Sequence, residues 1–466
     1  MLLLTALFAL HTFLLMGTGT WSDLAMAGEE FGTTLYYVRE GVLAAGFLLY
    51  AAFAQWRKPN PLSCKAADIV GVVLVVLFAG CALALQVSGQ PVVCVAAALV
   101  IALLVGVSGG MVYERIALAA AKGEGSSNSQ QRDACRLLGI IVGGGGAVAV
   151  ALQYALQTGF SLGGWLAVCF VACFALIVWL ARALRPESSE SQGMENAGKG
   201  SLAVMPFVCL AVAATCLFSL LTFYGAVMRA SGAVASLYEW HRLFLVVGYA
   251  IIGVAAYVGG RPAASVAILI AALFAIIVSA QTAMLEAGPL TTVLFYTLLG
   301  AELAWSNIAF MSAAPQSRCP AFVASTGRVL VALVSLAESL FYAIGELSLM
   351  AVLVISLVLL AIVVVAMVKG GFLVFAKPEA DGAELPEEEP VLSAEERMRQ
   401  LARESGLSAR EQDVLAALVL TEDKNQQIAD ELGISRRQLQ NHISHIYEKT
   451  GATTRAGLVM RVNGES

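Results

Sequence analysis

Charged side chains are scarce in this sequence. Only 13% of the 466 residues are Asp, Glu, Lys or Arg, whereas 59% are hydrophobic. Soluble domains are usually about a quarter charged, so this composition excludes a soluble protein for most of the chain. The shortage of charge therefore predicts that most of the chain lies in a membrane.

Signals for metal, cofactor or enzyme chemistry are also missing. None of the nine cysteines shows Cys-x-x-Cys or Cys/His metal-ligand spacing, so we interpret them as small apolar packing residues. The glycine run Gly143–Gly146 lies inside an apolar segment and lacks the Lys-Ser/Thr of a phosphate-binding loop, which favours close helix packing or a bend. We expect no metal site, no cofactor and no enzymatic activity.

What the sequence does contain is a series of long apolar segments. A spanning helix needs roughly 20 mostly apolar residues. The opening segment lacks a basic start and a small-residue cleavage site, so we interpret it as a span and not as a signal peptide. About twelve spans are expected, near residues 2–17, 37–55, 67–87, 91–113, 136–157, 162–182, 202–227, 239–259, 263–285, 289–311, 320–343 and 347–368.

Basic residues gather in alternate loops between these segments, and such loops usually face the cytoplasm. Both termini are then cytoplasmic. The basic set is Arg57, Lys58, Lys65, Arg115, Lys122, Arg132, Arg182, Arg185, Lys199, Arg261 and Arg318, and the opposite loops hold Asp23, Glu29, Glu30 and Glu286.

A polar loop, residues 183–200, divides the spans into two sets of six, residues 1–182 and 201–375. Leu35-Tyr-Tyr-Val-Arg-Glu40 and Leu237-Tyr-Glu-Trp-His-Arg242 open the second and eighth spans, which are equivalent when two six-helix halves are parallel repeats. This arrangement resembles the major facilitator superfamily over roughly residues 1–375. The loop Gln55–Lys65 keeps only the positive charge of that family's motif between spans two and three, which weakens an inference of ordinary transport.

Several polar residues fall within the expected spans, where a charge costs about 2.5–3.5 kcal/mol on insertion scales. Glu302 lies mid-span with Trp305 and Asn307 nearby, and these three are candidates for sensing a ligand or a proton. The alternative is a structural hydrogen bond to a neighbouring helix. Arg39, His241 and Arg242 lie near the outer ends, where they line an outward mouth or simply extend to the interface.

Beyond residue 375 the sequence changes character. Residues 376–404 form an acidic, proline-bearing linker and a short linker helix. Ser393-x-x-Glu396, Ser408-x-x-Glu411 and Ser435-x-x-Gln438 are capping-box patterns, which begin helices near 393–404, 408–420 and 436–449. A helix over 424–432 ends at Gly433, and a last one covers about 453–462. The fold class is therefore all-α: a membrane bundle of about twelve helices followed by a small four-helix domain.

The third helix of this small domain predicts a nucleic-acid surface. Leu439, Ile443 and Ile446 share its inner side, and the candidate DNA-binding residues are Arg436, Arg437, Gln440, Asn441, Ser444, Lys449 and Arg455. Lys449 and Arg455 are expected on phosphate. Seven basic and seven acidic residues balance over 407–463, so a protein-interaction domain is the alternative, although the third helix holds only one acid, Glu448.

Residues 405–466 resemble the LuxR-type helix-turn-helix. The resemblance rests on Leu407-Ser-x-Arg-Glu-x-Asp-Val-Leu415, Ile428-Ala-x-x-Leu-Gly-Ile-Ser435, His442, Ile446-Tyr-x-Lys449 and Thr454-Arg455. It implies DNA binding in a bacterium. Three departures are a turn at Leu420–Lys424 that is one residue longer, Gln438-Leu-Gln440 where the family usually has Thr-Val-Lys, and no receiver domain or soluble autoinducer pocket before the module.

Together these observations predict a regulator embedded in the bacterial inner membrane. Its facilitator-like part senses an unknown small molecule or a proton and controls the DNA-binding tail, and two tails pair as a homodimer on DNA. A secondary transporter whose tail binds DNA or only protein is the alternative.

Overall fold

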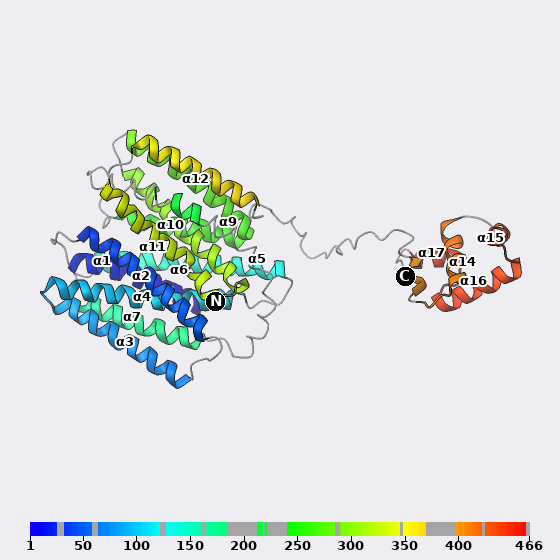
Figure 1. The fold of residues 1–466 in the computed structure, drawn as a ribbon, viewed down its shortest axis with the longest axis horizontal. Helices are drawn as coiled ribbons and strands as arrows, with labels where there is room; N and C mark the ends of the chain where they lie inside the picture. Colours follow the sequence, from blue (N-terminus) through cyan, green and yellow to red (C-terminus); the bar gives the residue numbers. More distant parts are fainter. Residues whose placement is uncertain are drawn as a thin grey trace. The chain divides into compact units, whose positions relative to one another are not determined.

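The computed structural model divides the chain into two compact units, residues 1–375 and 376–466 (Figure 1). Every regular element in the described part of the chain is a helix, which confirms the all-α fold class. The described residues are 1–25, 32–57, 64–121, 127–159, 164–184, 212–217, 220, 240–284, 289–344, 348–369, 398–399, 401–403, 405–421 and 425–462.

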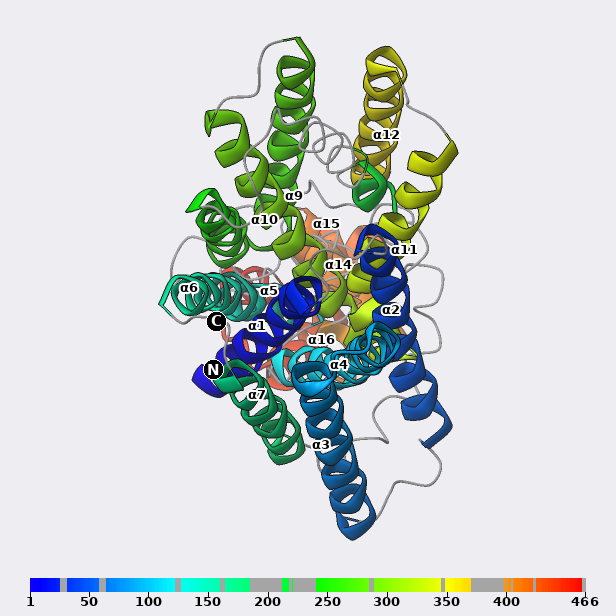
Figure 2. The same ribbon diagram turned by 90° about the vertical axis from the view of Figure 1, so that its left-hand side faces the viewer.

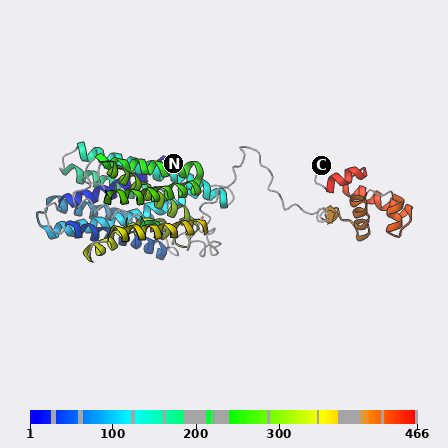
Figure 3. The same ribbon diagram turned by 90° about the horizontal axis from the view of Figure 1, so that it is seen from above.

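Long helices occupy those predicted spans of the first unit that the structure describes, and they run side by side (Figure 3). Seven of the described helices are long and apolar enough to cross a bilayer, with two shorter apolar ones beside them. The predicted span 202–227 and the middle loop lie mostly outside the described residues. The helices are α1 (Leu2–Ala25), α2 (Gly32–Arg57), α3 (Cys64–Val87), α4 (Pro91–Ala120), α5 (Ser127–Leu138), α6 (Gly145–Gly159), α7 (Gly164–Ala183), α9 (Leu245–Met284), α10 (Pro289–Ala313), α11 (Pro320–Ile344) and α12 (Leu349–Lys369), with short turns η1 (Gly139–Gly144), η3 (Trp240–Phe244) and η4 (Ala314–Gln316).

The eighth and ninth predicted spans are two helices that meet at a kink, and the label α9 covers both of them. At about 1.5 Å per residue, 40 residues are far longer than a bilayer core of about 30 Å. The helix is interrupted at Gly260, whose φ of 64° and ψ of −151° suit glycine alone, and Pro262 follows. The turn between the two spans is therefore made by one glycine.

Large apolar side chains on the outermost helices point away from the protein interior. Ile69, Val72, Val76 and Leu83 of α3 are mostly exposed, as are many side chains of α12. A soluble protein rarely exposes apolar patches of this size, so these surfaces are the ones that contact lipid.

Helices from the two halves of the sequence form two groups (Figure 2), and glycines hold corresponding helices together in each. A Cβ on Gly46 of α2 would collide with the Leu103 carbonyl of α4, and one on Gly248 of α9 with the Thr297 carbonyl of α10. The spacing from Gly46 to Gly248 is the same as from Leu35 to Leu237. The close contact between two helices therefore occurs at equivalent positions of the two sequence repeats.

The predicted close packing of the glycine run is confirmed. The fifth predicted span contains a π turn, η1, between α5 and α6. A Cβ on Gly143 would lie 2.7 Å from the Cα of Gly253 on α9, and one on Gly146 would enter the ring of Tyr249. Small residues thus let a first-half helix and a second-half helix touch backbone to backbone.

The second unit folds around its own core. It contains α14 (Ala409–Leu420), α15 (Asn425–Glu431), α16 (Arg436–Thr450) and α17 (Arg455–Val462). The capping boxes at Ser408 and Ser435 are both present, and Gly433 and Gly451 adopt positive φ where helices end. The predicted helix start at Ser393 lies outside the described residues. The core comprises Ala402, Leu407, Val414, Leu415, Leu418, Ile428, Ala429, Leu439, Ile446, Ala452 and Leu458.

Candidate nucleic-acid interface

Helix α16 buries one side and exposes a polar face. Leu439, Ile446 and Thr450 are buried at helical spacing against α14 and α15. Five of the predicted DNA-binding residues lie on the opposite, exposed face: Arg436, Arg437, Gln440, Asn441 and Ser444. The packing of the domain therefore presents these side chains together, with the two arginines in the first turn.

The beginning of α16 is fixed by its capping box. Ser435 Oγ accepts from the backbone N–H of Gln438, and Gln438 Oε1 accepts from the backbone N–H of Ser435 at 2.9 Å. The glutamine that replaces a usual threonine is therefore used in capping the helix. Ser444 Oγ donates to the main-chain carbonyl of Gln440 at 3.0 Å, and Gln440 itself is exposed.

Three arginines of the domain cap helix C-termini, where carbonyl groups lack partners within the helix. Arg410 Nη2 donates to the Leu432 carbonyl after α15 at 2.8 Å. Arg455 Nε donates to the Leu418 carbonyl of α14 at 2.8 Å, and its guanidinium also reaches the Thr421 carbonyl. Arg461 donates to the Thr450 carbonyl at the end of α16. These arginines stabilise the fold.

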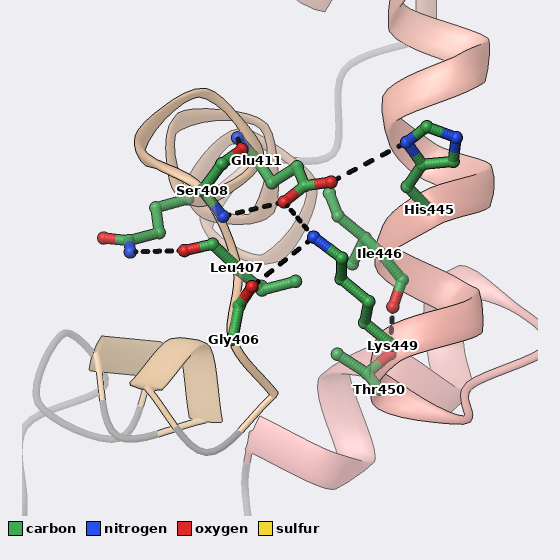
Figure 4. A network of polar contacts seen from close by, with 9 residues as sticks. Gly406, Leu407, Ser408, Glu411, His445, Ile446, Lys449 and Thr450 are labelled. Atoms are coloured by element: carbon green, nitrogen blue, oxygen red, sulfur yellow. Dashed lines mark hydrogen bonds and ion pairs between the residues drawn. The ribbon is translucent and has the colours of Figure 1, made fainter.

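Glu411 joins α14 to α16 (Figure 4). Its Oε2 accepts from Lys449 Nζ at 2.7 Å and from the Ser408 backbone N–H at 2.7 Å, and its Oε1 lies 3.8 Å from His445 Nδ1. The Glu411 side chain is 5% exposed. The hydrogen bond from Lys449 and then the bond from the Ser408 amide lower the pKa of Glu411 to about 2.

The predicted DNA-binding cations therefore fall into two groups, those that bond within the domain and those that do not. Lys449 bonds to Glu411 and the Gly406 carbonyl, and Arg455 bonds within the domain, so their predicted phosphate contacts would be additional to these bonds. Within the described residues, Arg436 and Arg437 make no hydrogen bond or ion pair. Both side chains are exposed.

His445 belongs to the same exposed face, and the sequence interpretation missed it. It lies two helical turns after Arg437 and is exposed. Helical spacing alone was the signal that could have found it.

The predicted sensing residues of the membrane unit are buried. Glu302 and Trp305 of α10 are both 3% exposed. The amide of Asn307 donates to the Leu303 carbonyl one turn earlier at 2.7 Å, a bond within its own helix. Among the described residues Glu302 forms no hydrogen bond or ion pair.

The other three predicted residues lie elsewhere in the unit. Arg39 of α2 is buried and lies 3.8 Å from Glu40. His241 and Arg242 belong to η3, which packs against α10, and the His241 ring stacks on Trp240 with centroids 4.0 Å apart.

Helix α11 supplies a cation that the sequence interpretation did not select. Arg328 Nη2 lies 3.5 Å from Glu40 Oε2 of α2. Arg328 also interacts electrostatically with Glu302, with His11 of α1, with Tyr113 of α4 and with Tyr249 of α9. These groups come from six helices, so their proximity was hidden in the sequence.

His11 is fully buried within this group. Its Nε2 donates to the Val105 carbonyl at 3.2 Å, and its ring meets Tyr113 edge-on at 5.5 Å between centroids. A histidine inside an apolar first span was the signal that could have drawn attention to it.

Comparison with known proteins agrees with both parts of the chain. Residues 405–462 match the family model described as bacterial regulatory proteins, luxR family. Comparison with curated proteins found no match.

Solved structures of transporters resemble the chain. An auto-inhibited POT family peptide transporter has a TM-score of 0.50 and 12% identity, with 80% of this chain and 96% of that chain covered. The human organic anion transporter MFSD10 (TETRAN) has a TM-score of 0.48 and 14% identity, over 80% of this chain and 96% of its own. The first of these likenesses shows a fold of the major-facilitator kind.

The chain thus combines a LuxR-type helix-turn-helix domain with a transporter-like, polytopic membrane domain. The first implies a DNA partner and the second a lipid bilayer.

Proposed function

We propose that the protein is a membrane-embedded transcriptional regulator whose transporter-like unit senses a small molecule or a proton and controls the DNA-binding tail. The exposed face of α16 carries this proposal, because its polar residues are not used by the core of the domain. The joining of that domain to a bundle with buried Glu302 and partly buried Arg328 supports a sensing role.

On DNA, the first turns of α16 enter the major groove. The side chains of Gln440 and Asn441 can form paired bonds with adenine, and Arg436 and Arg437 can bond guanine or phosphate. One short helix reads few bases, so two domains act as a homodimer on a two-fold site, with α17 as the contact between them.

The DNA-binding tail requires a cytoplasmic C-terminus. The basic loops support this orientation, with both termini inside the inner membrane. A ligand that binds one of two membrane-domain conformations more tightly shifts their populations, and the linker then changes the pairing of the tails.

Binding to DNA selected from a random-sequence library tests the regulatory function. The full chain in lipid nanodiscs is expected to bind, and the log of its affinity to fall with log salt at a slope near −2 per domain, because each neutralised phosphate contributes about −0.9. Arg437→Ala should reduce the slope by about 1, and Gln440→Ala should change the preferred base. Arg403→Ala, which removes an exposed charge outside α16, is the control. If both α16 variants bind DNA with the same affinity, salt dependence and base preference as the wild type, the proposal is wrong.

Secondary transport with a regulatory tail is the second candidate, favoured by the transporter fold and by the buried Glu302. Uptake of labelled compounds into proteoliposomes that is lost in Glu302→Gln would support it.

A further inference from the structure

One buried carboxylate connects helices from the two halves of the sequence. Glu40 of α2 lies 3.8 Å from Arg39 of its own helix and 3.5 Å from Arg328 of α11. The three side chains are only 8%, 12% and 15% exposed, in the order Arg39, Glu40, Arg328. The two helices pack closely along their length (Figure 2), so Glu40 is a bridge across this contact.

The bridge is not a closed ion pair. Charge-assisted bonds between guanidinium and carboxylate groups are about 2.7–2.9 Å long, shorter than both distances at Glu40. A second carboxylate that offers two well-placed oxygens to one of these guanidinium groups can therefore compete with Glu40.

A small cavity opens beside the bridge. Its polar wall is Thr18, Arg39 and Glu40, and its other walls are apolar: Leu15, Leu43, Ala98, Ile101, Ala102 and Val105. One charged wall beside apolar walls suits the head of a very small carboxylate. The cavity has room for about one water molecule, so a ligand must displace Glu40 to enter.

We propose that the membrane unit senses a small monocarboxylate, which replaces Glu40 on Arg328 and Arg39 and thereby opens the bridge between α2 and α11. The inference rests on the proposed sensing function and gives it a ligand class. A guanidinium binds carboxylate through two parallel bonds, which a neutral amide of the same shape cannot reproduce. Displacement also explains how binding changes the protein: the ligand favours the conformation in which Glu40 is released.

Ligand binding to the full chain in detergent, without DNA, tests this inference. The probes are formate and acetate, each paired with its carboxamide, formamide or acetamide. We expect the carboxylates to raise the thermal unfolding midpoint and the amides to leave it unchanged. Equal shifts from acid and amide, or no shift from either carboxylate, would overturn the proposal.

Variants then locate the site. Glu40→Gln removes the competing carboxylate and should tighten acetate binding about tenfold. Arg328→Lys keeps the charge but lacks the planar guanidinium that forms two parallel bonds, and it should weaken acetate binding about tenfold. Glu114→Gln is the matched control, because Glu114 is also a membrane carboxylate but accepts from Tyr50 of α2 at 2.6 Å, within the first half of the chain.

Acetate affinity that is unchanged in both bridge variants would overturn the proposal. If Glu40→Gln fails to fold, the Arg328→Lys result decides alone. Since no DNA is present, failure here leaves the DNA-binding result of the regulator untouched.

Discussion

Glu411 shows how a single side chain ties two helices of the DNA-binding domain together. We expect Glu411→Gln to lower the free energy of unfolding of the isolated 391–466 fragment by about 2 kcal/mol, because the partly buried bond to Lys449 loses the negative charge of its acceptor. Urea unfolding followed by circular dichroism measures the change. Glu448→Gln, on the exposed side of α16, is the control and should be near neutral.

The pH dependence of stability provides a second test of the same bond. Because the pKa of Glu411 is lowered to about 2 in the folded domain from an ordinary 4.5, its stabilisation is present above pH 4.5 and is lost as pH falls toward 2. The difference in stability between wild type and Glu411→Gln should therefore shrink over this range. A constant difference would contradict the assignment.

The sequence was sufficient to predict which α16 residues are exposed, because apolar spacing determines the face of a helix. It was not sufficient to predict how the cations are used. Lys449 bonds Glu411 and Arg455 bonds Leu418, partners 38 and 37 positions away. Such bonds depend on how the helices pack, and a family resemblance does not show them.

At the scale of helices, the glycine contact between η1 and α9 can be tested by comparing alanine substitutions at two neighbouring glycines. A Cβ on Gly143 would lie 2.7 Å from backbone atoms of Gly253, whereas one on Gly144 would have its nearest neighbour at 4.0 Å. Backbone cannot move aside as a side chain can, so overpacking should destabilise by about 1–3 kcal/mol. We expect Gly143→Ala, but not Gly144→Ala, to lower the thermal unfolding midpoint in detergent.

Equal unfolding midpoints for the two alanine variants would show that an added methyl group is accommodated equally well at both positions, and that the close approach to α9 is not required. Gly253→Ala offers the reciprocal change from α9, where a Cβ would meet the Gly139 carbonyl at 2.8 Å. It should resemble Gly143→Ala.

Span positions were predictable because length and apolarity directly reflect bilayer thickness. The π turn at Gly139–Gly144 was not. The boundary between the eighth and ninth predicted spans, in contrast, coincides with the kink at Gly260. The close helix contacts at Gly46 and Gly248 lie at equivalent positions of the two halves and so support a sequence repeat that was faint on its own.

For the molecule as a whole, two independently packed units share one chain, and each has its own core. If Arg436 and Arg437 of α16 supply the phosphate or base contacts, as proposed, a single copy has limited electrostatic affinity. The proposed control by the membrane unit then requires only a change in how often two tails meet.

This argument predicts that pairing alone can replace the membrane unit. Residues 391–466 fused to a dimeric coiled coil should bind the selected DNA site about 100-fold more tightly than the monomeric fragment, because the second contact becomes intramolecular. Fluorescence anisotropy with labelled DNA measures both affinities, and the same fusion with Arg437→Ala controls for binding by the coiled coil itself. If the fused and monomeric fragments bind equally well, pairing is not the controlled step, and the membrane unit must act on the DNA-binding face within each tail.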